Sequence, residues 1–387
     1  MSGQAVRCFG LFQISVIRPR RACGSIGVEL NDLDTPALAV DLDRMEKNMQ
    51  RMVKFTKECG VALRPHVKTH KAPEIARMQL DAGSRGVCLQ KVSEVEVFAR
   101  EGIDDIFLTN EVVVSEKLLR LAMVATKVHV GVAVDDPDVA RSMGRIFKES
   151  GSEVDVYVDV DVGMHRCGVS DPAVAAELAR IVSGQDGLVF KGLMGYEGNV
   201  NGAKSKAEQV RLAGAAMSEI TNAKSAIEKA GMSVGAVSVG SSVSTWINAK
   251  HPAVTEVQPG MYIFNDHVLV DRGVATWEDC ALTVVTTVVS KPAPDRAVVD
   301  AGSKAFNFDT GLFPIPFDRD GVKMVHFSEE HGWLELKGKG RDLRVGDRIS
   351  FVPAHCCTTI NQFEELNGVR KGKVDKVFPI LARGKMT

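Results

Sequence analysis

The sequence predicts an α/β protein that consists of a (β/α)8 TIM-like barrel and a C-terminal, mainly antiparallel β domain. In the middle of the chain, short β-rich runs alternate with stretches of helical period. Eight such units over roughly 220 residues match the size of a (β/α)8 barrel. The runs are nearly continuous in apolar or β-branched residues, which is typical of strands buried on both faces. After about Asp271 strands follow one another without long helices, which indicates a separate β domain.

Eight runs supply the expected barrel strands. They begin at residues 62 (ALRPHVK), 86 (GVCLQK), 105 (DIFLTN), 128 (VHVGVAV), 154 (VDVYVDVDVG), 188 (LVFKGLMGYEG), 236 (AVSVGSS) and 254 (VTEVQPGMYIF). Helical stretches follow most of them, the longest at 204–230. The run TPALAVDL at 35–42 would be a ninth strand, so it is expected to pair elsewhere. The β domain is expected to contain the strands ALTVVTTVVS, RAVVDAG, GWLELKG, DRISFVPAHC and KVDKVFPI.

Composition excludes several classes of function. The chain has 387 residues, and its 48 basic and 49 acidic side chains nearly cancel. No global field therefore attracts nucleic acid or an anionic membrane. No run of about 18 apolar residues exists that could span a bilayer. The eight cysteines are scattered without a CxxC pair, which favours a reducing compartment over a disulfide framework.

The first 28 residues differ from the rest. They contain four arginines and no acidic residue before Glu29. This pattern is that of an organelle transit peptide or of a solvated tail, and the two interpretations stay open. We expect a cytoplasmic or organellar protein, with a mitochondrion or plastid indicated if the leader is a targeting signal.

Two basic side chains near the end of the first barrel strand are candidates for chemistry. His66 and Lys68 are two positions apart, so on a strand they would face the same way. A lysine buried at that end is costly unless it loses its proton, and a deprotonated lysine is a candidate Schiff-base nucleophile. The alternative is a surface lysine just past the strand. His66 is a candidate proton-transferring base.

Other strand ends offer an arginine and two small-residue turns. Arg166 could anchor an anionic or phenolate oxygen, or it could be an ordinary loop arginine. Gly/Ser turns that open short helices can hold a phosphate with their free N–H groups. The position of these turns on late barrel strands fits the usual phosphate site of barrels. The candidate turn residues are Gly240, Ser241, Ser242, Gly260 and Met261.

The sequence AHCC in the β domain is a candidate metal site. His355 and Cys357 would share one face of a strand end, and imidazole with thiolate suits zinc or another divalent ion. Two protein ligands would leave positions for water or substrate. The alternative is a buried thiol pair beside a satisfied histidine. The chain has no GxGxxG and no GxxxxGK[ST] motif, so a dinucleotide or P-loop site lacks its usual support.

Taken in order, the motifs resemble those of a known enzyme family. They are TPALAVDLDRMEKN, RPHVKTHK, CLQKVSEVEVFAREG, VDVGMHRCGV, GLMGYEGNV, EVQPGMYIF, VVDAGSK and VPAHCC. From about Asp34 to its end, the chain resembles the D-threonine aldolase and eukaryotic-type D-serine dehydratase family. These are pyridoxal-phosphate enzymes of the alanine racemase fold, fold type III.

The resemblance implies roles and domain bounds. The barrel at 45–268 would bind pyridoxal 5'-phosphate, and a β domain at 29–44 and 269–387 would carry the metal. Lys68, not Lys71, would hold the cofactor, and Arg166 would face its phenolic oxygen. Tyr196 would line the pocket, and Gln258 would face the pyridine nitrogen. The Gly240–Ser242 turn and the backbone at Gly260 and Met261 would hold the phosphate. His355 and Cys357 would bind zinc, manganese or magnesium.

The family's two reactions both start from a D-configured 3-hydroxy-amino acid. Retro-aldol cleavage converts D-threonine to glycine and acetaldehyde. Dehydration of D-serine or D-3-hydroxyaspartate gives an oxo acid and ammonia. Tyr196 and Gly198 match the aldolase side and favour it, because the dehydratases carry a His-x-Gly-His type segment there. RPHVKTHK and Cys357 look closer to the dehydratases.

Two further interpretations stay open. One is a non-catalytic pyridoxal-phosphate carrier, which the β domain with its His–Cys pair disfavours. The other is a Schiff-base aldolase without this cofactor, which the two phosphate-type turns disfavour. The resemblance also implies a homodimer that acts on a small D-amino acid, with no nucleic acid or membrane partner.

Overall fold

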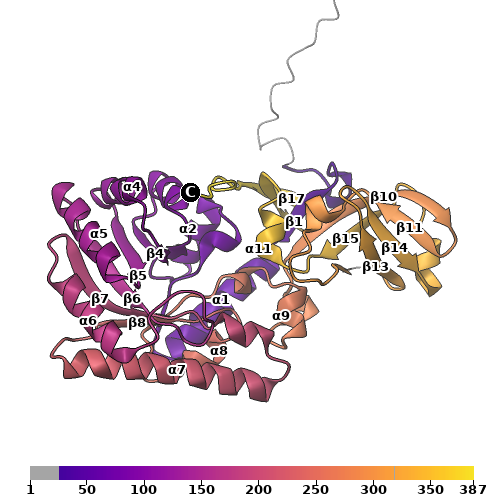
Figure 1. The fold of residues 1–387 in the computed structure, drawn as a ribbon. Coiled ribbons are helices and arrows are strands. Elements are labelled where there is room, and N and C mark those ends of the chain that lie inside the picture. Colours follow the sequence, from indigo (N-terminus) through magenta and orange to yellow (C-terminus); the bar gives the residue numbers. More distant parts are fainter. Residues whose placement is uncertain (1–25, 318) are drawn as a thin grey trace, which may run out of the picture.

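The computed structural model describes residues 26–317 and 319–387. The predicted leader at 1–28 therefore lies outside the described residues, except for its last three positions. No helix in the described parts of the chain is long and apolar enough to cross a bilayer. Figure 1 shows two units, a barrel surrounded by helices and a smaller body of twisted strands.

Eight parallel strands form the barrel in the order β2-β9-β8-β7-β6-β5-β4-β3. The sheet closes because His66, just past β2, makes a parallel bridge to Cys88 of β3. The predicted (β/α)8 barrel is confirmed. Its strands are β2 (Ala62–Leu63), β3 (Val87–Leu89), β4 (Asp105–Glu111), β5 (His129–Val134), β6 (Val154–Asp159), β7 (Leu188–Met194), β8 (Ala236–Val239) and β9 (Glu256–Val257).

Helices cover the outside of the barrel (Figure 1). Two of them begin at an aspartate followed by proline: Asp136 and Asp171 each accept backbone N–H bonds from the first turn. Their apolar sides pack on the strands. The helices of this part are α1 (Leu42–Glu58), α2 (Pro73–Asp81), α3 (Val92–Arg100), α4 (Ser115–Ala125), α5 (Pro137–Glu149), α6 (Pro172–Ser183), α7 (Lys206–Lys229), α8 (Thr245–Asn248) and α9 (His267–Asp271).

The second unit is a nine-stranded mixed sheet with the main order β13-β14-β11-β10-β1-β16-β17, while β15 pairs with β10 and β12. Three of its strands, β12, β13 and β16, were not expected from the sequence. Its elements are β1 (Ala37–Asp41), β10 (Leu282–Ala293), β11 (Arg296–Val299), β12 (Ile315–Pro316), β13 (Val322–Phe327), β14 (Gly332–Leu336), β15 (Arg348–Val352), β16 (Glu365–Arg370), β17 (Lys373–Pro379), α10 (Ser303–Phe306) and α11 (Cys356–Ile360).

The strand β1 is the run that had no place among the barrel strands. It lies inside the second sheet, antiparallel to β10 and parallel to β16. Asp41 then caps α1, which carries the chain back to the barrel. There Asn48 donates to the carbonyls of Ile263 and Asp279 at 3.2 and 2.8 Å. This crossing ties the two units together near the end of β9.

The helix α11 lies where the β domain meets the barrel (Figure 1). Its first N–H, of Cys356, donates to Asp266 Oδ2 at 2.9 Å. At its C-terminal end, Asn361 Oδ1 accepts a hydrogen bond from Lys71 Nζ at 2.9 Å. The β domain therefore places α11 against the carboxyl ends of the barrel strands, where barrel enzymes keep their sites.

Candidate active site

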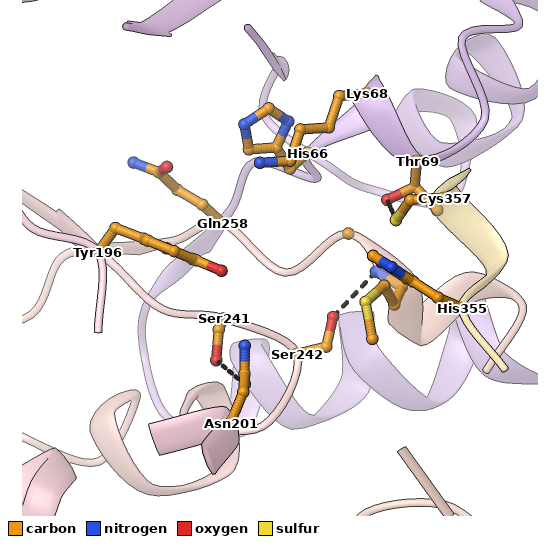
Figure 2. A pocket seen from close by; sticks show the side chains of 12 residues that line it. His66, Lys68, Thr69, Tyr196, Asn201, Ser241, Ser242, Gln258, His355 and Cys357 are labelled. Atoms are coloured by element: carbon orange, nitrogen blue, oxygen red, sulfur yellow. Dashed lines mark hydrogen bonds between the residues drawn. The ribbon is translucent and has the colours of Figure 1, made fainter. Parts of the chain in front are cut away.

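A cavity of about 210 Å³ lies between α11 and the barrel. Figure 2 shows side chains from both units around it: His66 and Lys68 on one side, Ser241 and Ser242 opposite them, and His355 nearby. All predicted site residues line the cavity except Arg166 and Gly240, which lie just outside it. The lining also includes two residues that the sequence had not indicated. The lining residues are His66, Lys68, Thr69, Tyr196, Asn201, Ser241, Ser242, Gln258, Gly260, Met261, His355 and Cys357.

Lys68 reaches the cavity from a 3-10 turn, Val67–Thr69, and not from a strand as expected. The last strand-like bond here runs from His66 N to Pro259 O at 3.0 Å. The next bond of this parallel ladder would need the N–H of Met261, which instead donates to Ser242 Oγ, and the chain turns. Burial lowers the pKa of Lys68. The Cys357 thiolate raises this pKa, and the guanidinium of Arg166 lowers it further. The amine is thus easier to deprotonate than an exposed lysine.

His66 is 9% exposed and is held as a neutral imidazole. Burial, followed by the charge of Lys68, lowers its pKa well below the usual value. Thr109 gives its hydroxyl proton to Leu89 O, so its oxygen accepts from His66 Nε2–H at 2.9 Å. Nδ1 is therefore the unprotonated nitrogen. It is buried and has no hydrogen-bond partner among the described residues.

The two small-residue turns meet at one end of the cavity. Ser242 Oγ accepts from the N–H of Met261 at 2.9 Å, which joins them. A Cβ at Gly260 would lie 2.5 Å from Thr69 Oγ1, so only glycine fits. Gly240 has φ +107, a backbone conformation that side chains rarely adopt.

The turn after β8 is less open than expected. The N–H of Gly240 donates to Glu197 Oε2 at 3.0 Å, and that of Ser241 to Ser244 Oγ at 2.7 Å. Those of Ser242 and Gly260 have no partner among the described residues. Ser241 also donates to Asn201 Oδ1 at 3.2 Å. The donors open to an anion are thus fewer than the glycine-serine pattern had indicated.

Tyr196 lines the cavity, and Arg166 lies beside its ring. The guanidinium carbon of Arg166 lies 5.0 Å from the centre of the Tyr196 ring, and Lys68 Nζ lies 5.8 Å from the same ring. Burial raises the pKa of Tyr196 despite the nearby arginine. The phenol therefore stays protonated and neutral beside the Arg166 guanidinium and the Lys68 amine.

Gln258 is fixed by a buried network that the sequence had not revealed. Ser238 donates to Glu256 Oε1 at 2.6 Å, and Arg64 Nε pairs with Glu256 Oε2 at 2.9 Å. Arg64 also makes two bonds to Asp105, at 2.7 and 3.1 Å. Because the hydroxyl of Ser238 donates its proton to the carboxylate of Glu256, Ser238 Oγ can only accept a hydrogen bond from Gln258 Nε2, at 2.7 Å. The network therefore sets which way the Gln258 amide points.

His355 and Cys357 lie at the start of α11, not on a strand end as expected. β15 ends at Val352, because Pro353 follows and lacks the N–H that a ladder needs. His355 caps the helix, and both side chains still face the cavity (Figure 2). A hydrogen bond of 3.4 Å joins Cys357 Sγ and Thr69 Oγ1.

In the absence of a metal, the electrostatics of this pair favour an imidazolium beside a thiolate. A hydrogen bond from Cys356, with nearby His355, lowers the pKa of Cys357 although burial opposes this. Burial also opposes the charge on His355, but the Cys357 thiolate and Asp309 outweigh it and raise the pKa of His355 to about 11. Asp309 Oδ2 accepts from His355 Nδ1 at 2.7 Å. No motif in the sequence had pointed to Asp309.

The donor set suits a metal with open coordination positions. Asp309 holds Nδ1, which leaves Nε2 of His355 for a metal, as in many carboxylate–histidine–zinc arrangements. No group of three or more His, Cys, Asp or Glu side chains within residues 26–317 and 319–387 is arranged to hold a metal ion. A metal here would thus have two protein ligands, His355 and Cys357.

Comparisons with known proteins agree with this architecture. A model of the alanine racemase N-terminal domain matches residues 40–267, and a model of the serine dehydratase domain matches residues 281–369. The 3-hydroxy-D-aspartate aldolase of Paracoccus denitrificans (strain Pd 1222) is 37% identical over 93% of this chain and 94% of its own length. The chain belongs to the D-threonine aldolase and D-serine dehydratase family.

Other members of this family divide between two reactions. The D-threonine aldolase of Arthrobacter sp is 35% identical over 92% of this chain and 95% of its own. The crystal structure of D-threonine aldolase from Filomicrobium marinum superposes with a TM-score of 0.90 at 36% identity, covering 94% of this chain and 99% of that one. The D-threo-3-hydroxyaspartate dehydratase of Delftia sp. (strain HT23) is 30% identical over 86% and 93%. Aldolases and dehydratases are lyases, so the predicted lyase family is confirmed.

Proposed function

We propose that this enzyme cleaves D-3-hydroxy-amino acids by a retro-aldol reaction that depends on pyridoxal 5'-phosphate and a divalent metal. D-Threonine would give glycine and acetaldehyde. One observation carries the proposal: an easily deprotonated lysine and a His–Cys pair face the same cavity, from the barrel and from the β domain. A carrier protein would need only the first of these features.

The cavity residues fit the cofactor. Lys68 would bind its aldehyde carbon, and Ser241, Ser242 and the Gly260 turn would hold its phosphate. The buried, unpartnered Nδ1 of His66 and the glycine-only approach at Gly260 support a group packed against this wall. When bound, the cofactor supplies an electron sink for the bond that breaks. Arg166 would face its phenolic oxygen.

Gln258 would face the pyridine nitrogen as a neutral amide. Racemase relatives place an arginine there. The Glu256–Arg64 pair is complete without Gln258, so the network adds no proton to this position.

The metal would be held by His355 and Cys357. Thiolate with imidazole suits zinc better than manganese or magnesium, which prefer oxygen ligands. The ion would act as a Lewis acid toward the 3-hydroxyl group of the substrate. This would place that hydroxyl next to Lys68, within the same cavity.

The proton on the 3-hydroxyl must pass to a base. His66 is our candidate, because its Nδ1 carries a free lone pair and its burial keeps the ring neutral. Thr109 and Gln90 hold Nε2 and so fix the plane of the ring. His66 would thus accept a proton with Nδ1 and keep the proton on Nε2.

Dehydration of D-serine or D-3-hydroxyaspartate is the second candidate. The dehydratase among the relatives and the His-x-Cys pair favour it. The segment between β7 and α7 does not favour dehydration. Its only acidic side chain, Glu197, accepts hydrogen bonds from Gly240 N and Asn248 Nδ2. It therefore offers no carboxylate to remove the proton on the α carbon.

The test uses the cofactor-loaded enzyme with D-threonine and zinc, followed by proton NMR. Glycine and acetaldehyde would support the aldolase, whereas 2-oxobutyrate and ammonia would replace it with the dehydratase. No turnover of D-threonine, D-serine or D-3-hydroxyaspartate by enzyme that retains the cofactor would refute both. Lys68→Ala is expected to abolish turnover and the absorption band of the covalently bound cofactor, while Lys71→Ala should keep that band.

Two features remain predictions of the family resemblance and the leader. We expect a homodimer, which sedimentation equilibrium of the cofactor-loaded enzyme would test. We expect import into an organelle if residues 1–28 are a targeting signal, which the location of a fluorescent fusion would test.

A further inference from the structure

A series of buried hydrogen bonds runs from Gln258, in the cavity wall, through the inside of the barrel. Ser238, Glu256 and Arg64 follow Gln258 in this series, and we call the four residues the Gln258 network. Ser238 is 0% exposed, and Glu256 and Arg64 are each 2% exposed. None of these three residues lines the cavity. They can therefore act on a ligand in the cavity only through Gln258.

The direction of each hydrogen bond in the Gln258 network is determined. The carboxylate of Glu256 pairs with Arg64 Nε at 2.9 Å, and a carboxylate can only accept, so Ser238 donates to it. A serine hydroxyl has one proton to give, so Ser238 Oγ accepts from Gln258. The end of the Gln258 amide that meets Ser238 is therefore the nitrogen.

The amide oxygen of Gln258 is the end that remains for a ligand. Gln258 is 8% exposed and lines the cavity, where Figure 2 shows its side chain beside that of His66. No group within residues 26–317 and 319–387 donates a hydrogen bond to Gln258 Oε1. An amide oxygen accepts hydrogen bonds and cannot donate one, so the partner that fits here is an N–H or O–H group of the ligand.

We propose that Ser238, Glu256 and Arg64 hold the oxygen of Gln258 toward the ring nitrogen of bound pyridoxal 5'-phosphate and so keep that nitrogen protonated. A hydrogen-bond acceptor stabilises the protonated nitrogen and disfavours the unprotonated one, whose lone pair it would face. The Gln258 network has no proton to give, so the nitrogen takes its proton from water. A protonated ring draws electrons more strongly from the bond that breaks.

The inference rests on the proposed function and adds positioning residues to it. That function gives the aldehyde carbon of the cofactor to Lys68, its phosphate to the two small-residue turns and its phenolic oxygen to Arg166. The ring nitrogen is the polar atom of the cofactor that remains for Gln258. An arginine, which the racemase relatives place there, can only donate and so favours an unprotonated nitrogen. The oxygen of Gln258 favours the opposite state.

The test measures the protonation of the ring nitrogen directly, in the resting enzyme. The enzyme is loaded with cofactor that carries nitrogen-15 in the ring, and the chemical shift of this nitrogen is followed against pH to obtain its pKa. Gln258→Met keeps the length of the side chain and removes both ends of the amide. It should lower the pKa of the ring nitrogen by about one to two pH units, the value of one hydrogen bond to a charged group.

Two variants test whether the Gln258 network sets the direction of the amide. Ser238→Ala removes the oxygen that holds the amide nitrogen, so the pKa of the ring nitrogen should fall, but by less than in Gln258→Met. In Glu256→Gln the new amide would turn its oxygen to Arg64 and its nitrogen to Ser238. The proton of Ser238 would then pass to Gln258 Oε1, and this pKa should fall as well. The control Ser218→Ala removes a hydroxyl from the exposed face of α7 and should leave it unchanged.

The sign of the change decides the result. If an amide N–H of Gln258 faced the ring, Gln258→Met would raise the pKa of the ring nitrogen. A higher or unchanged pKa in Gln258→Met would therefore overturn the proposal. Unchanged values in both Ser238→Ala and Glu256→Gln would overturn the part given to the Gln258 network.

The outcomes are also separate from those of the proposed reaction, because no substrate is present. The expected fall in pKa, in an enzyme that makes no glycine from D-threonine, would support the role of Gln258 and refute the aldolase. Cleavage of D-threonine without that fall would support the aldolase and refute the role of Gln258.

Discussion

Replacing Asp309 by asparagine tests whether a residue outside the cavity prepares the metal site. Asp309 Oδ2 accepts from His355 Nδ1–H at 2.7 Å, and Oδ1 accepts from Thr358 Oγ1 at 3.1 Å. The carboxylate therefore keeps the proton of His355 on Nδ1 and leaves the Nε2 lone pair for a metal. Asparagine has the same shape but only one oxygen.

The size of the effect depends on which bond the asparagine keeps. If its oxygen stays with Thr358, its amide faces Nδ1 and favours the proton on Nε2, which must then be lost on binding. If the amide flips, the tautomer survives and only the negative charge is lost. Outer partners of ligating histidines are typically worth about 10–100-fold in metal affinity, or roughly 1.4–2.7 kcal/mol. We expect Asp309→Asn to fall within this range.

The assay is a competitive zinc titration with a fluorescent chelator, carried out on the cofactor-loaded enzyme. Asp342→Asn is the matched control, because Asp342 is exposed in the 3-10 turn Gly338–Asp342 and does not line the cavity. Zinc affinity should fall in Asp309→Asn alone, with the cofactor absorption unchanged. An Asp309→Asn protein that binds zinc as tightly as the parent would refute the assigned role of Asp309.

Three further predictions concern stability. Burial lowers the pKa of His70 to about 4, so the unfolded chain binds this proton before the folded protein does as the pH falls below about 6.5. The free energy of unfolding should therefore fall by up to about 3 kcal/mol by pH 4. A pKa of 6.5 measured for His70 by NMR would contradict this. Arg64→Met should cost about 3–5 kcal/mol in urea unfolding, because Glu256 keeps an unpaired buried charge. Adding Glu256→Gln should restore part of that loss, and additive losses would argue against the pair. Gly192→Ala should prevent barrel closure, since its Cβ would lie 1.9 Å from Ala236 O; circular dichroism of a folded Gly192→Ala protein would exclude this clash.

The barrel was predictable because its signals are local. Strands buried on both faces need apolar or β-branched residues in short runs, and helices need capping residues such as Asp136 and Asp171. The β domain was less predictable. The strand β16 has the sequence ELNGVR, whose asparagine and glycine disfavour a strand, and it forms because β1 and β17 pair with its two edges.

Site residues were predictable as types but not as conformations. Spacing alone suggested that His66 and Lys68, and also His355 and Cys357, would lie on strands. In both places the strand pairing stops early, and a turn or helix begins instead. The four side chains still line one cavity. Residues two positions apart in a short helical turn can both reach a cavity that lies next to the turn.

The residues that orient the site could not be read from the sequence, because their partners are distant along the chain. Asp309 meets His355 across 46 residues, and Arg64 meets Glu256 across 192. No local pattern marks an aspartate such as Asp309 that will bond a histidine. None marks a serine such as Ser238, which bonds a carboxylate and thereby orients the amide of Gln258. Such residues act through geometry that exists only after the barrel closes and the β domain docks on it.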